Sequence, residues 1–242
     1  MRPGTPASEP RGSHLAPRTS PLEPHPSPLD PRIGILGGTL DPIHCGHLAA
    51  AAAARDALDL SRVLVLPSRI PPHRAVQPLA SPFHRFAMAC LAVAGMPRFE
   101  ASDDELRSEG PSYTADTLER QHAAGATPSQ IFFITGADAF AEIATWKRYP
   151  EVLDLANFVV VTRPGHSVDA LAARLPALAG RMRPATAQPA ATPCIYLLPA
   201  VTPDVSSTIV RERLQRGEPI AGLVPPLVEA HIHQHRLYNQ GR

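Results

Sequence analysis

The sequence contains little of what would mark a secreted, membrane-bound or strongly charged protein. Its three cysteines, Cys45, Cys90 and Cys194, are far apart and form no CxxC pair, which argues against a disulfide framework or a structural zinc site. No apolar run approaches the roughly 20 residues of a membrane-spanning helix, and the first residues lack the apolar stretch of a signal peptide. The net charge of +1 gives no overall field that would attract nucleic acid. We therefore expect a cytoplasmic protein that binds neither a membrane nor nucleic acid.

Residues 1–31 differ in composition from the rest of the 242-residue chain. This segment is rich in proline and has almost no large apolar side chains, so burial could not offset the entropy lost on ordering. We expect a disordered extension, and the sequence leaves open whether the working protein needs it. Residues 32–242 are predicted to form a single domain.

The pattern of apolar runs from residue 32 onward predicts an α/β protein. Short, continuous apolar segments alternate with helical stretches, which indicates a parallel sheet covered on both faces. We therefore expect a Rossmann-like, doubly wound parallel sheet with helices on both faces and a C-terminal helical segment. The expected strands lie at 32–36, 62–67, 98–102, 131–138, 158–165 and 195–200. The expected helices lie near 47–60, 81–95, 112–125, 168–175, 207–216 and 225–236, with short pieces around 139–143 and 150–155, and a loop is expected over 176–193.

Glycine and polar residues follow several of these strands. Sheets of this kind bind their ligands outside the carboxyl ends of the strands, at the point where the strand order reverses. The sequence therefore predicts a ligand site at this edge of the sheet. The residues that follow the carboxyl ends of predicted strands are Gly37, Gly38, Thr39, Asp41, His44, His47, Gly136, Asp138, Arg163 and Gly165, with Ser206, Ser207, Thr208 and Arg211 after the last strand.

The segment GGTLDPIHCGHL (37–48) has features that suit phosphate binding, although its spacing is neither GxGxxG nor that of a P-loop. Two successive glycines let backbone N–H groups approach a ligand, and the helix that begins near Gly46 directs its positive end at the same place. His44 and His47 are three residues apart, so they share a face of the first helical turn and could donate to phosphoryl oxygens. The alternative is that one histidine caps the helix and the other packs against it.

The segment VSSTIVRERL (205–214) has a second set of phosphate donors. Ser206, Ser207 and Thr208 begin a predicted helix, and Arg211 follows one turn later on the same side. A simple N-cap would explain one serine but not three hydroxyls with an arginine. Two helix N-termini with such donors suggest a polyphosphate such as ATP.

GGTLDPIHCGHL together with SSTIVR resembles the nucleotidyltransferase superfamily that carries an (H/T)xGH motif and a C-terminal SSTxxR motif. Within it, residues 32–238 are similar to the nicotinate-nucleotide adenylyltransferases. The further stretches that resemble this family are PSRIPPHR (67–74), EGPSYTADTL (109–118), FFITGADAFAEIATWKRYPEVL (132–153), VVVTRPG (159–165) and LVPPLVEAHIHQHRLY (223–238). The resemblance implies transfer of AMP from ATP to nicotinate mononucleotide by direct in-line attack, with Mg²⁺ accompanying ATP and no dedicated metal site in the protein.

The resemblance also implies roles for individual residues. His44, His47 and Arg211 would be the catalytic residues, with His47 stabilising the charge that develops at the α-phosphorus. The implied ATP-binding residues are Gly37, Gly38, Thr39, Gly46, Arg163, Ser207, Thr208 and Arg211. The implied mononucleotide-binding residues are His73, Tyr113, Thr114, Gly136, Asp138 and Trp146, and Trp146 would stack on the pyridine ring unless it is simply a core residue.

Several alternatives stay open at this point. The acceptor could be nicotinamide mononucleotide or phosphopantetheine, or the chain could bind nucleotides without catalysis, and assembly into a homo-oligomer is left open. Asp103, Asp104 and Glu105 are expected to form a solvated acidic turn rather than an acid–base pair. His231 and His235 are expected on a surface or partly packed helix rather than in a metal site.

Overall fold

The computed structural model of the chain describes Met1 and residues 31–72, 78–162, 168–187 and 190–239. The predicted N-terminal extension falls almost wholly outside these residues, and so do His73 and Arg163. Within these ranges, none of the helices combines the length and the apolar character that a membrane span needs.

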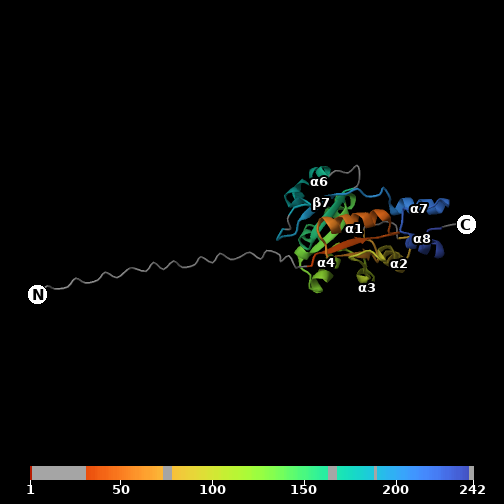
Figure 1. The fold of residues 1–242 in the computed structure, drawn as a ribbon, viewed down its shortest axis with the longest axis horizontal. Helices are drawn as coiled ribbons and strands as arrows, with labels where there is room; N and C mark the ends of the chain where they lie inside the picture. The colour runs from red at the N-terminus through yellow and green to blue at the C-terminus, as the bar shows by residue number, and fades with distance from the viewer. Residues whose placement is uncertain (2–30, 73–77, 163–167, 188–189, 240–242) are drawn as a thin grey trace.

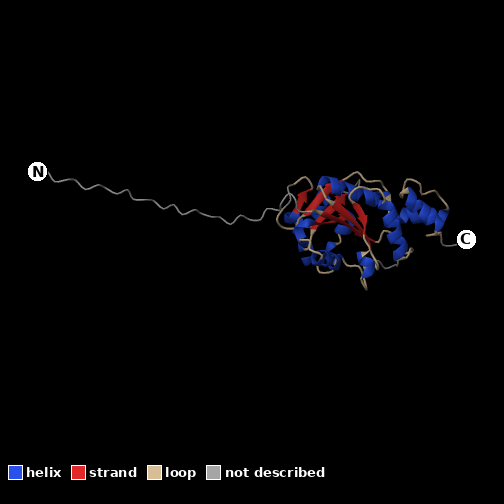
Figure 2. Cartoon of the chain, turned by 60° about the horizontal axis from the view of Figure 1, so that its bottom comes forward, coloured by secondary structure: helices blue, strands red, loops and turns tan. Residues whose placement is uncertain are grey.

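Within the described residues, seven parallel strands form one sheet at the centre of the domain (Figures 1 and 2), in the order β3-β2-β1-β4-β5-β7-β6. β1 pairs with both β2 and β4, so that Ile35 lies opposite Leu64 on one side and Phe133 on the other. The strand order reverses between β1 and β4, which opens a crevice at their carboxyl ends. The predicted doubly wound parallel sheet is confirmed. The strands are β1 (Ile33–Gly38), β2 (Arg62–Pro67), β3 (Phe99–Ala101), β4 (Ile131–Gly136), β5 (Asn157–Thr162), β6 (Met182–Pro184) and β7 (Ile195–Pro199).

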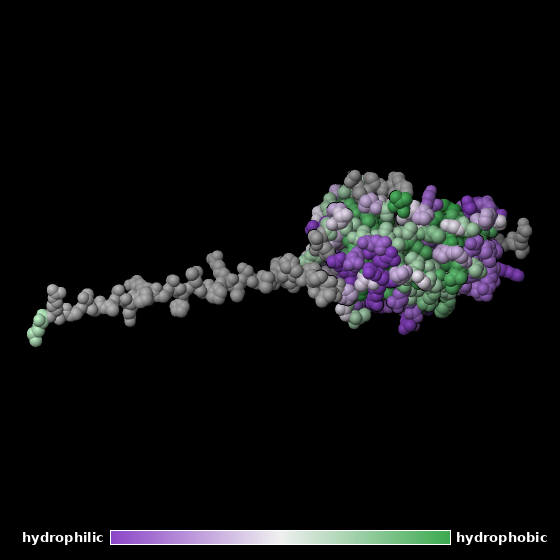
Figure 3. Space-filling model, viewed as in Figure 1, coloured by the Kyte–Doolittle hydropathy of each residue, from purple (hydrophilic) through white to green (hydrophobic). Residues whose placement is uncertain are grey.

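Helices cover both faces of this sheet. The α-helices are α1 (Cys45–Ala57), α2 (Pro82–Val93), α3 (Asp104–Arg107), α4 (Thr114–Ala123), α5 (Ala137–Phe140), α6 (Val168–Arg174), α7 (Ser207–Arg216) and α8 (Pro226–Gln234). The expected C-terminal helical segment is therefore present as α7 and α8, which lie at the same end of the domain in Figure 1. Figure 3 shows hydrophilic residues gathered at this end.

Side chains from alternate strand positions build two separate cores. Val63 and Val65 of β2 point to the face that α1, α2, α7 and α8 cover. Ile33 and Ile35 of β1 point to the face that α4, α5 and α6 cover. Because side chains alternate along a strand, these continuous apolar runs are buried on both faces, as a parallel sheet requires.

The edge strand β6 was not predicted from the sequence. Residues 176–193 were expected to form a loop, but Pro176–Arg181 form a 3₁₀-helix and Met182–Pro184 pair with β7. The strand has only three residues and ends in proline, which an edge strand tolerates because one side of its backbone needs no partner. A segment this short carries no readable alternation of side chains.

A fully buried arginine fastens the loops at the carboxyl edge of the sheet to α2. The guanidinium of Arg85 donates to the carbonyl oxygens of Thr39 and Ser68, at 2.7 and 2.5 Å. It also donates to the carbonyl oxygens of Arg69 and Ala80, at 3.1 and 3.2 Å. The turn after β1 and the loop after β2 are thus held in fixed positions by one side chain.

A buried carboxylate completes this network. Asp41 is only 2% exposed, and its oxygens accept hydrogen bonds from the backbone N–H groups of Leu79 and Ala80 at 2.9 and 3.1 Å. The hydroxyl of Tyr238, near the C-terminus, donates to the same carboxylate at 2.8 Å. Burial, followed by the negative charge of Asp41, raises the pKa of this phenol far above its usual range, so Tyr238 remains a donor.

Tyr238→Phe should lower the free energy of unfolding by about 1–3 kcal/mol, because a buried carboxylate would lose one of its three donors. Tyr149→Phe is a matched control, since Tyr149 is half-buried and its hydroxyl bonds to no other described residue. Urea denaturation of both variants measures the difference. An equal loss in both would show that the bond to Asp41 contributes nothing specific.

Candidate active site

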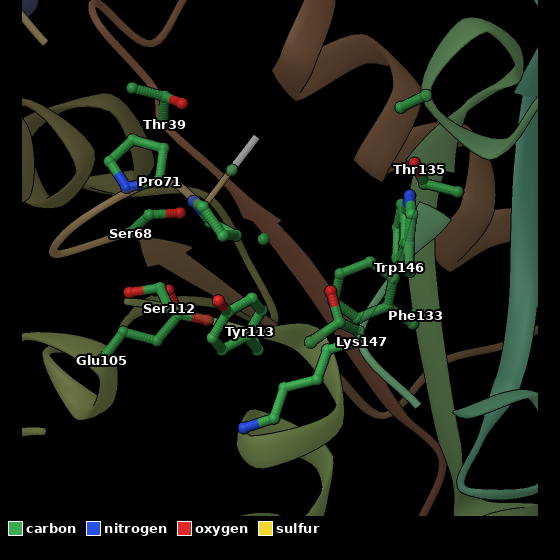
Figure 4. Close-up of a pocket in the computed structure, with 15 residues that line it drawn as sticks. Thr39, Ser68, Pro71, Glu105, Ser112, Tyr113, Phe133, Thr135, Trp146 and Lys147 are labelled. Carbon is green, nitrogen blue, oxygen red and sulfur yellow. The ribbon is translucent and has the colours of Figure 1, made fainter. Parts of the chain in front are cut away.

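A cavity of about 230 Å³ opens at the carboxyl edge of β1, β2 and β4 (Figure 4). Its walls come from the turn after β1, the loop after β2, the segment between α3 and α4, the end of β4, and the pair Trp146–Lys147. Predicted site residues that line this cavity are Gly37, Gly38, Thr39, Tyr113, Thr114 and Trp146. The structure therefore brings together residues that are more than a hundred positions apart in the sequence.

One side of this cavity is aromatic. Trp146 packs edge-to-face on Phe133, with ring centroids 6.0 Å apart, and on Phe158, at 6.2 Å. The ring of Tyr113, just before α4, lies 4.6 Å from the ammonium of Lys147. Figure 4 shows Trp146 beside Phe133 on one side of the cavity and Tyr113 nearer its middle. Such walls suit a flat heteroaromatic ring.

A second, smaller cavity of about 50 Å³ lies beside the N-terminus of α1. Gly46, His47 and Gly136 line it, and Thr135 lines both cavities. The two spaces therefore adjoin at the end of β4, next to the strand-order reversal.

The two histidines of HCGH cap α1 reciprocally. Nδ1 of His44 accepts from the backbone N–H of His47 at 3.4 Å, and Nδ1 of His47 accepts from that of His44 at 3.3 Å. Their rings stack with centroids 3.6 Å apart. His44 is 1% exposed, whereas His47 is half-buried and lines the smaller cavity. Both histidines are thus part of the helix cap, and His47 also lines the smaller cavity.

A side chain larger than hydrogen at position 46, between these histidines, would be crowded. A Cβ on Gly46 would lie 3.1 Å from Nδ1 of His44 and 3.2 Å from a methyl carbon of Val205. Val205 precedes α7, so the absence of a side chain at position 46 lets the start of α7 approach the start of α1.

The N-terminus of α7 is fastened to the turn that leads into α1. The Ser207 hydroxyl donates to the carbonyl oxygen of Pro42 at 2.9 Å, and the Arg211 guanidinium donates to that of Asp41 at 2.7 Å. Arg211 also donates to the Thr208 hydroxyl at 3.1 Å. The two helix N-termini predicted to bind phosphate are therefore neighbours.

Some predicted residues lie outside both cavities. Asp138 is exposed on α5, and Thr208 is exposed on α7. His44, Ser207 and Arg211 also line neither cavity, and they belong to the framework around the N-termini of α1 and α7. Their contacts with substrate stay predictions.

The expectation of a solvated acidic turn at 103–105 was wrong for Glu105. Asp103 and Asp104 are partly exposed and pair with Arg107 and Arg120, as solvated acids do. Glu105, however, is 5% exposed and lines the larger cavity. The helix α3 has four residues, which is too short for its inward side to be read from periodicity.

Burial leaves the carboxyl group of Glu105 incompletely bonded. Oε1 accepts from the Thr117 hydroxyl at 2.7 Å, while Oε2 has no hydrogen-bond partner among the described residues. Desolvation raises the pKa of Glu105, and it outweighs the lowering by Thr117, by the nearby Ser112 hydroxyl and by the charge of Arg120. The sequence offered no signal for this residue.

The histidines of α8 are partly packed, as expected. His231 is half-buried, with Nε2 3.1 Å from Nδ1 of His84 on α2, and His233 is exposed. Burial and the neighbouring imidazoles of His235 and His84 lower the pKa of His231. In the part of the chain that the structure describes, no three histidine, cysteine, aspartate or glutamate side chains are placed to hold a metal ion.

Comparison with known proteins agrees with this arrangement. Residues 35–213 match the family described as "Cytidylyltransferase-like". The chain is 44% identical over 206 residues to a Roseiflexus sp. (strain RS-1) protein named "Probable nicotinate-nucleotide adenylyltransferase", covering 85% of this chain and 97% of that one. It is 40% identical over 216 residues to a Geotalea daltonii protein of the same name, covering 87% of this chain and 100% of that one.

A solved structure shares the fold. Plasmodium falciparum nicotinic acid mononucleotide adenylyltransferase, complexed with NaAD, superposes with a TM-score of 0.63 at 17% identity, over 87% of this chain and 98% of that one. The match to the family model and the high coverage of the relatives lead to one conclusion. The chain belongs to the cytidylyltransferase-like family and, within it, to the nicotinate-nucleotide adenylyltransferases.

Proposed function

We propose that this protein transfers AMP from ATP to nicotinate mononucleotide, giving deamido-NAD and pyrophosphate. The observation that carries the proposal is the meeting of two helix N-termini and a glycine turn beside an aromatic-walled cavity, at the point where the strand order reverses. The names of the relatives and the fold shared with a nicotinic acid mononucleotide adenylyltransferase support the choice of acceptor.

The triphosphate of ATP would lie between the N-termini of α1 and α7. Both helices direct the positive ends of their dipoles at this place, and Arg211 is held there by its bond to Asp41. His47 faces the smaller cavity and would donate to a non-bridging oxygen on the α-phosphorus. The acceptor would fill the larger cavity, with its pyridine ring against Trp146.

The reaction needs no general base. The nucleophile is the 5′-phosphate of the acceptor, and its second pKa near 6 leaves it largely dianionic at pH 7. One of its oxygens forms a bond to the α-phosphorus while the bond from that phosphorus to the pyrophosphate oxygen breaks. The protein contributes alignment of the two nucleotides and stabilisation of the negative charge that they bring together.

The side chains described around the site suit a metal ion that arrives already bound to ATP. Since no cluster of metal-binding side chains occurs among the described residues, Mg²⁺ would be held mainly by phosphate oxygens and water. When bound, it supplies charge neutralisation on the triphosphate and on the departing pyrophosphate. The backbone and side chains at the two helix N-termini would orient the phosphates that carry it.

Pyrophosphate release tests the acceptor directly. With ATP and Mg²⁺, nicotinate mononucleotide should be used in large preference to nicotinamide mononucleotide and to phosphopantetheine. A preference for nicotinamide mononucleotide would contradict the assignment of the nicotinate form as the substrate. Activity with phosphopantetheine alone would contradict the assignment of a pyridine mononucleotide as the acceptor. No release with any acceptor from folded protein would support a binding module without catalysis.

His47→Ala should lower kcat by about 10²–10³-fold, the usual effect of removing one donor to a developing anion. The KM for ATP should change much less, because the helix N-termini remain. His233→Ala, on the exposed face of α8, is the matched control and should leave kcat unchanged. Steady-state kinetics and the melting temperature separate a catalytic effect from loss of the helix cap. A kcat within threefold of the wild type would remove His47 from the catalytic step.

Trp146→Ala should raise the KM for nicotinate mononucleotide about tenfold, since stacking on an aromatic side chain contributes roughly 1–3 kcal/mol per base. Trp146→Phe keeps a ring against Phe133 and should bring the KM for nicotinate mononucleotide most of the way back to the wild-type value. The KM for ATP serves as the internal control and should stay constant. Equal changes in both KM values would mean that Trp146 acts only as a core residue.

A further inference from the structure

Glu105 occupies an unusual position in the acceptor cavity. It lines the cavity with 5% of its surface exposed, and Oε2 is buried without a hydrogen-bond partner among the described residues. Figure 4 shows Glu105 beside Ser112, on the opposite side of the cavity from Trp146. A buried polar atom without a partner costs free energy, so a native protein that keeps one often uses it.

The cations near Glu105 are bonded to other groups. Arg120 pairs with Asp104 at 2.8 Å and also donates to the Thr117 hydroxyl at 3.1 Å. Arg69, from the loop after β2, donates to the carbonyl oxygens of Leu106 and Ser108.

Two further charged groups near the cavity, among the residues that the structure describes, are also paired. Lys147 binds both carboxylate oxygens of Asp116 on α4, at 3.0 and 2.9 Å. Asp103 pairs with Arg107 on the outer side of α3. An ionised Glu105 would therefore have no cation of its own among the described residues.

The acceptor brings negative charge into this cavity. Under the proposed function, nicotinate mononucleotide carries a ring carboxylate and a 5′-phosphate, both anionic at neutral pH. An ionised Glu105 would repel them in a space from which the ligand expels water. A protonated Glu105 would instead present an O–H donor.

We propose that Glu105 is an acceptor-binding residue that acts in its protonated form, its carboxyl group turning toward the cavity so that the O–H of Oε2 donates to an anionic oxygen of the nucleotide. This inference rests on the proposed function. The proton comes from the buffer and stays on Glu105, so acceptor binding is accompanied by proton uptake. Burial already raises the pKa of Glu105, which lowers the cost of this protonation. Acceptor affinity should fall as the pH rises above that pKa, because the ionised form must first regain a proton.

Isothermal titration calorimetry in two buffers of different ionisation enthalpy tests the proposal without turnover. At pH 7, binding of nicotinate mononucleotide to the wild type should be accompanied by net proton uptake, because Glu105 gains a proton when the acceptor binds. Glu105→Gln should take up almost none and keep its affinity within about threefold, because the amide N–H donates in the same place. Glu109→Gln, at an exposed glutamate four residues away, should behave as the wild type.

Two further ligands locate the anionic oxygen. Nicotinamide mononucleotide keeps the phosphate and loses the ring carboxylate, while nicotinate riboside keeps the carboxylate and loses the phosphate. Uptake that disappears with nicotinamide mononucleotide assigns the bond to the ring carboxylate. Uptake that disappears only with nicotinate riboside assigns it to the phosphate. Both results support the proposal.

Equal proton uptake by the wild type and Glu105→Gln would overturn the proposal, as would a loss of affinity of more than tenfold in a Glu105→Gln variant that still binds ATP. The second result would mean that the ionised carboxylate is what the acceptor needs, for instance to accept from a ribose hydroxyl. If Glu105→Gln does not fold, the affinity of the wild type for nicotinate mononucleotide is measured between pH 6 and 9. The proposal predicts that this affinity falls as the pH rises, and an affinity that does not change with pH would overturn it. Failure of the wild type to bind nicotinate mononucleotide at all would contradict the proposed function instead.

Discussion

The buried carboxylate of Asp41 is the interaction on which the site depends. A charge with 2% exposure is tolerated only when it is fully bonded, and here its donors come from the loop before α2 and from Tyr238 at the end of the chain. The backbone of the same turn accepts from Arg85, Ser207 and Arg211. The turn after β1 therefore connects α2, α7 and the C-terminal segment, and the start of α1 follows directly from it.

This connection explains how a site without a general base could work. When catalysis consists of alignment and charge stabilisation, its rate depends on how firmly the donors are held. Gly46 lets the starts of α1 and α7 approach each other, and the bond between Arg211 and Asp41 fixes the second helix relative to the first. The acceptor cavity adjoins this place through Thr135, so the two nucleotides would meet at the end of β4.

Much of this could be predicted from the sequence, because the relevant signals are local. Continuous apolar strands ending in glycine predicted the parallel sheet and placed a candidate ligand site at its carboxyl edge, and the HCGH segment predicted the start of α1. The strand β6 and the inward position of Glu105 could not be predicted, since each lies in a segment of three or four residues whose position depends on its neighbours. The bond from Tyr238 to Asp41 spans 197 residues, and no local pattern reports a contact of that kind. The substrate contacts of all the predicted site residues, those of His44 and Asp138 included, remain predictions.

A crystal structure with a non-hydrolysable ATP analogue and nicotinate mononucleotide tests the central claim most directly. The account predicts that the triphosphate lies between the N-termini of α1 and α7, within hydrogen-bond distance of His47 and Arg211, and that the pyridine ring rests against Trp146. It also predicts that the turn at Asp41 keeps the hydrogen bonds seen without ligand. Phosphates bound elsewhere, or a turn that rearranges to admit them, would contradict the account.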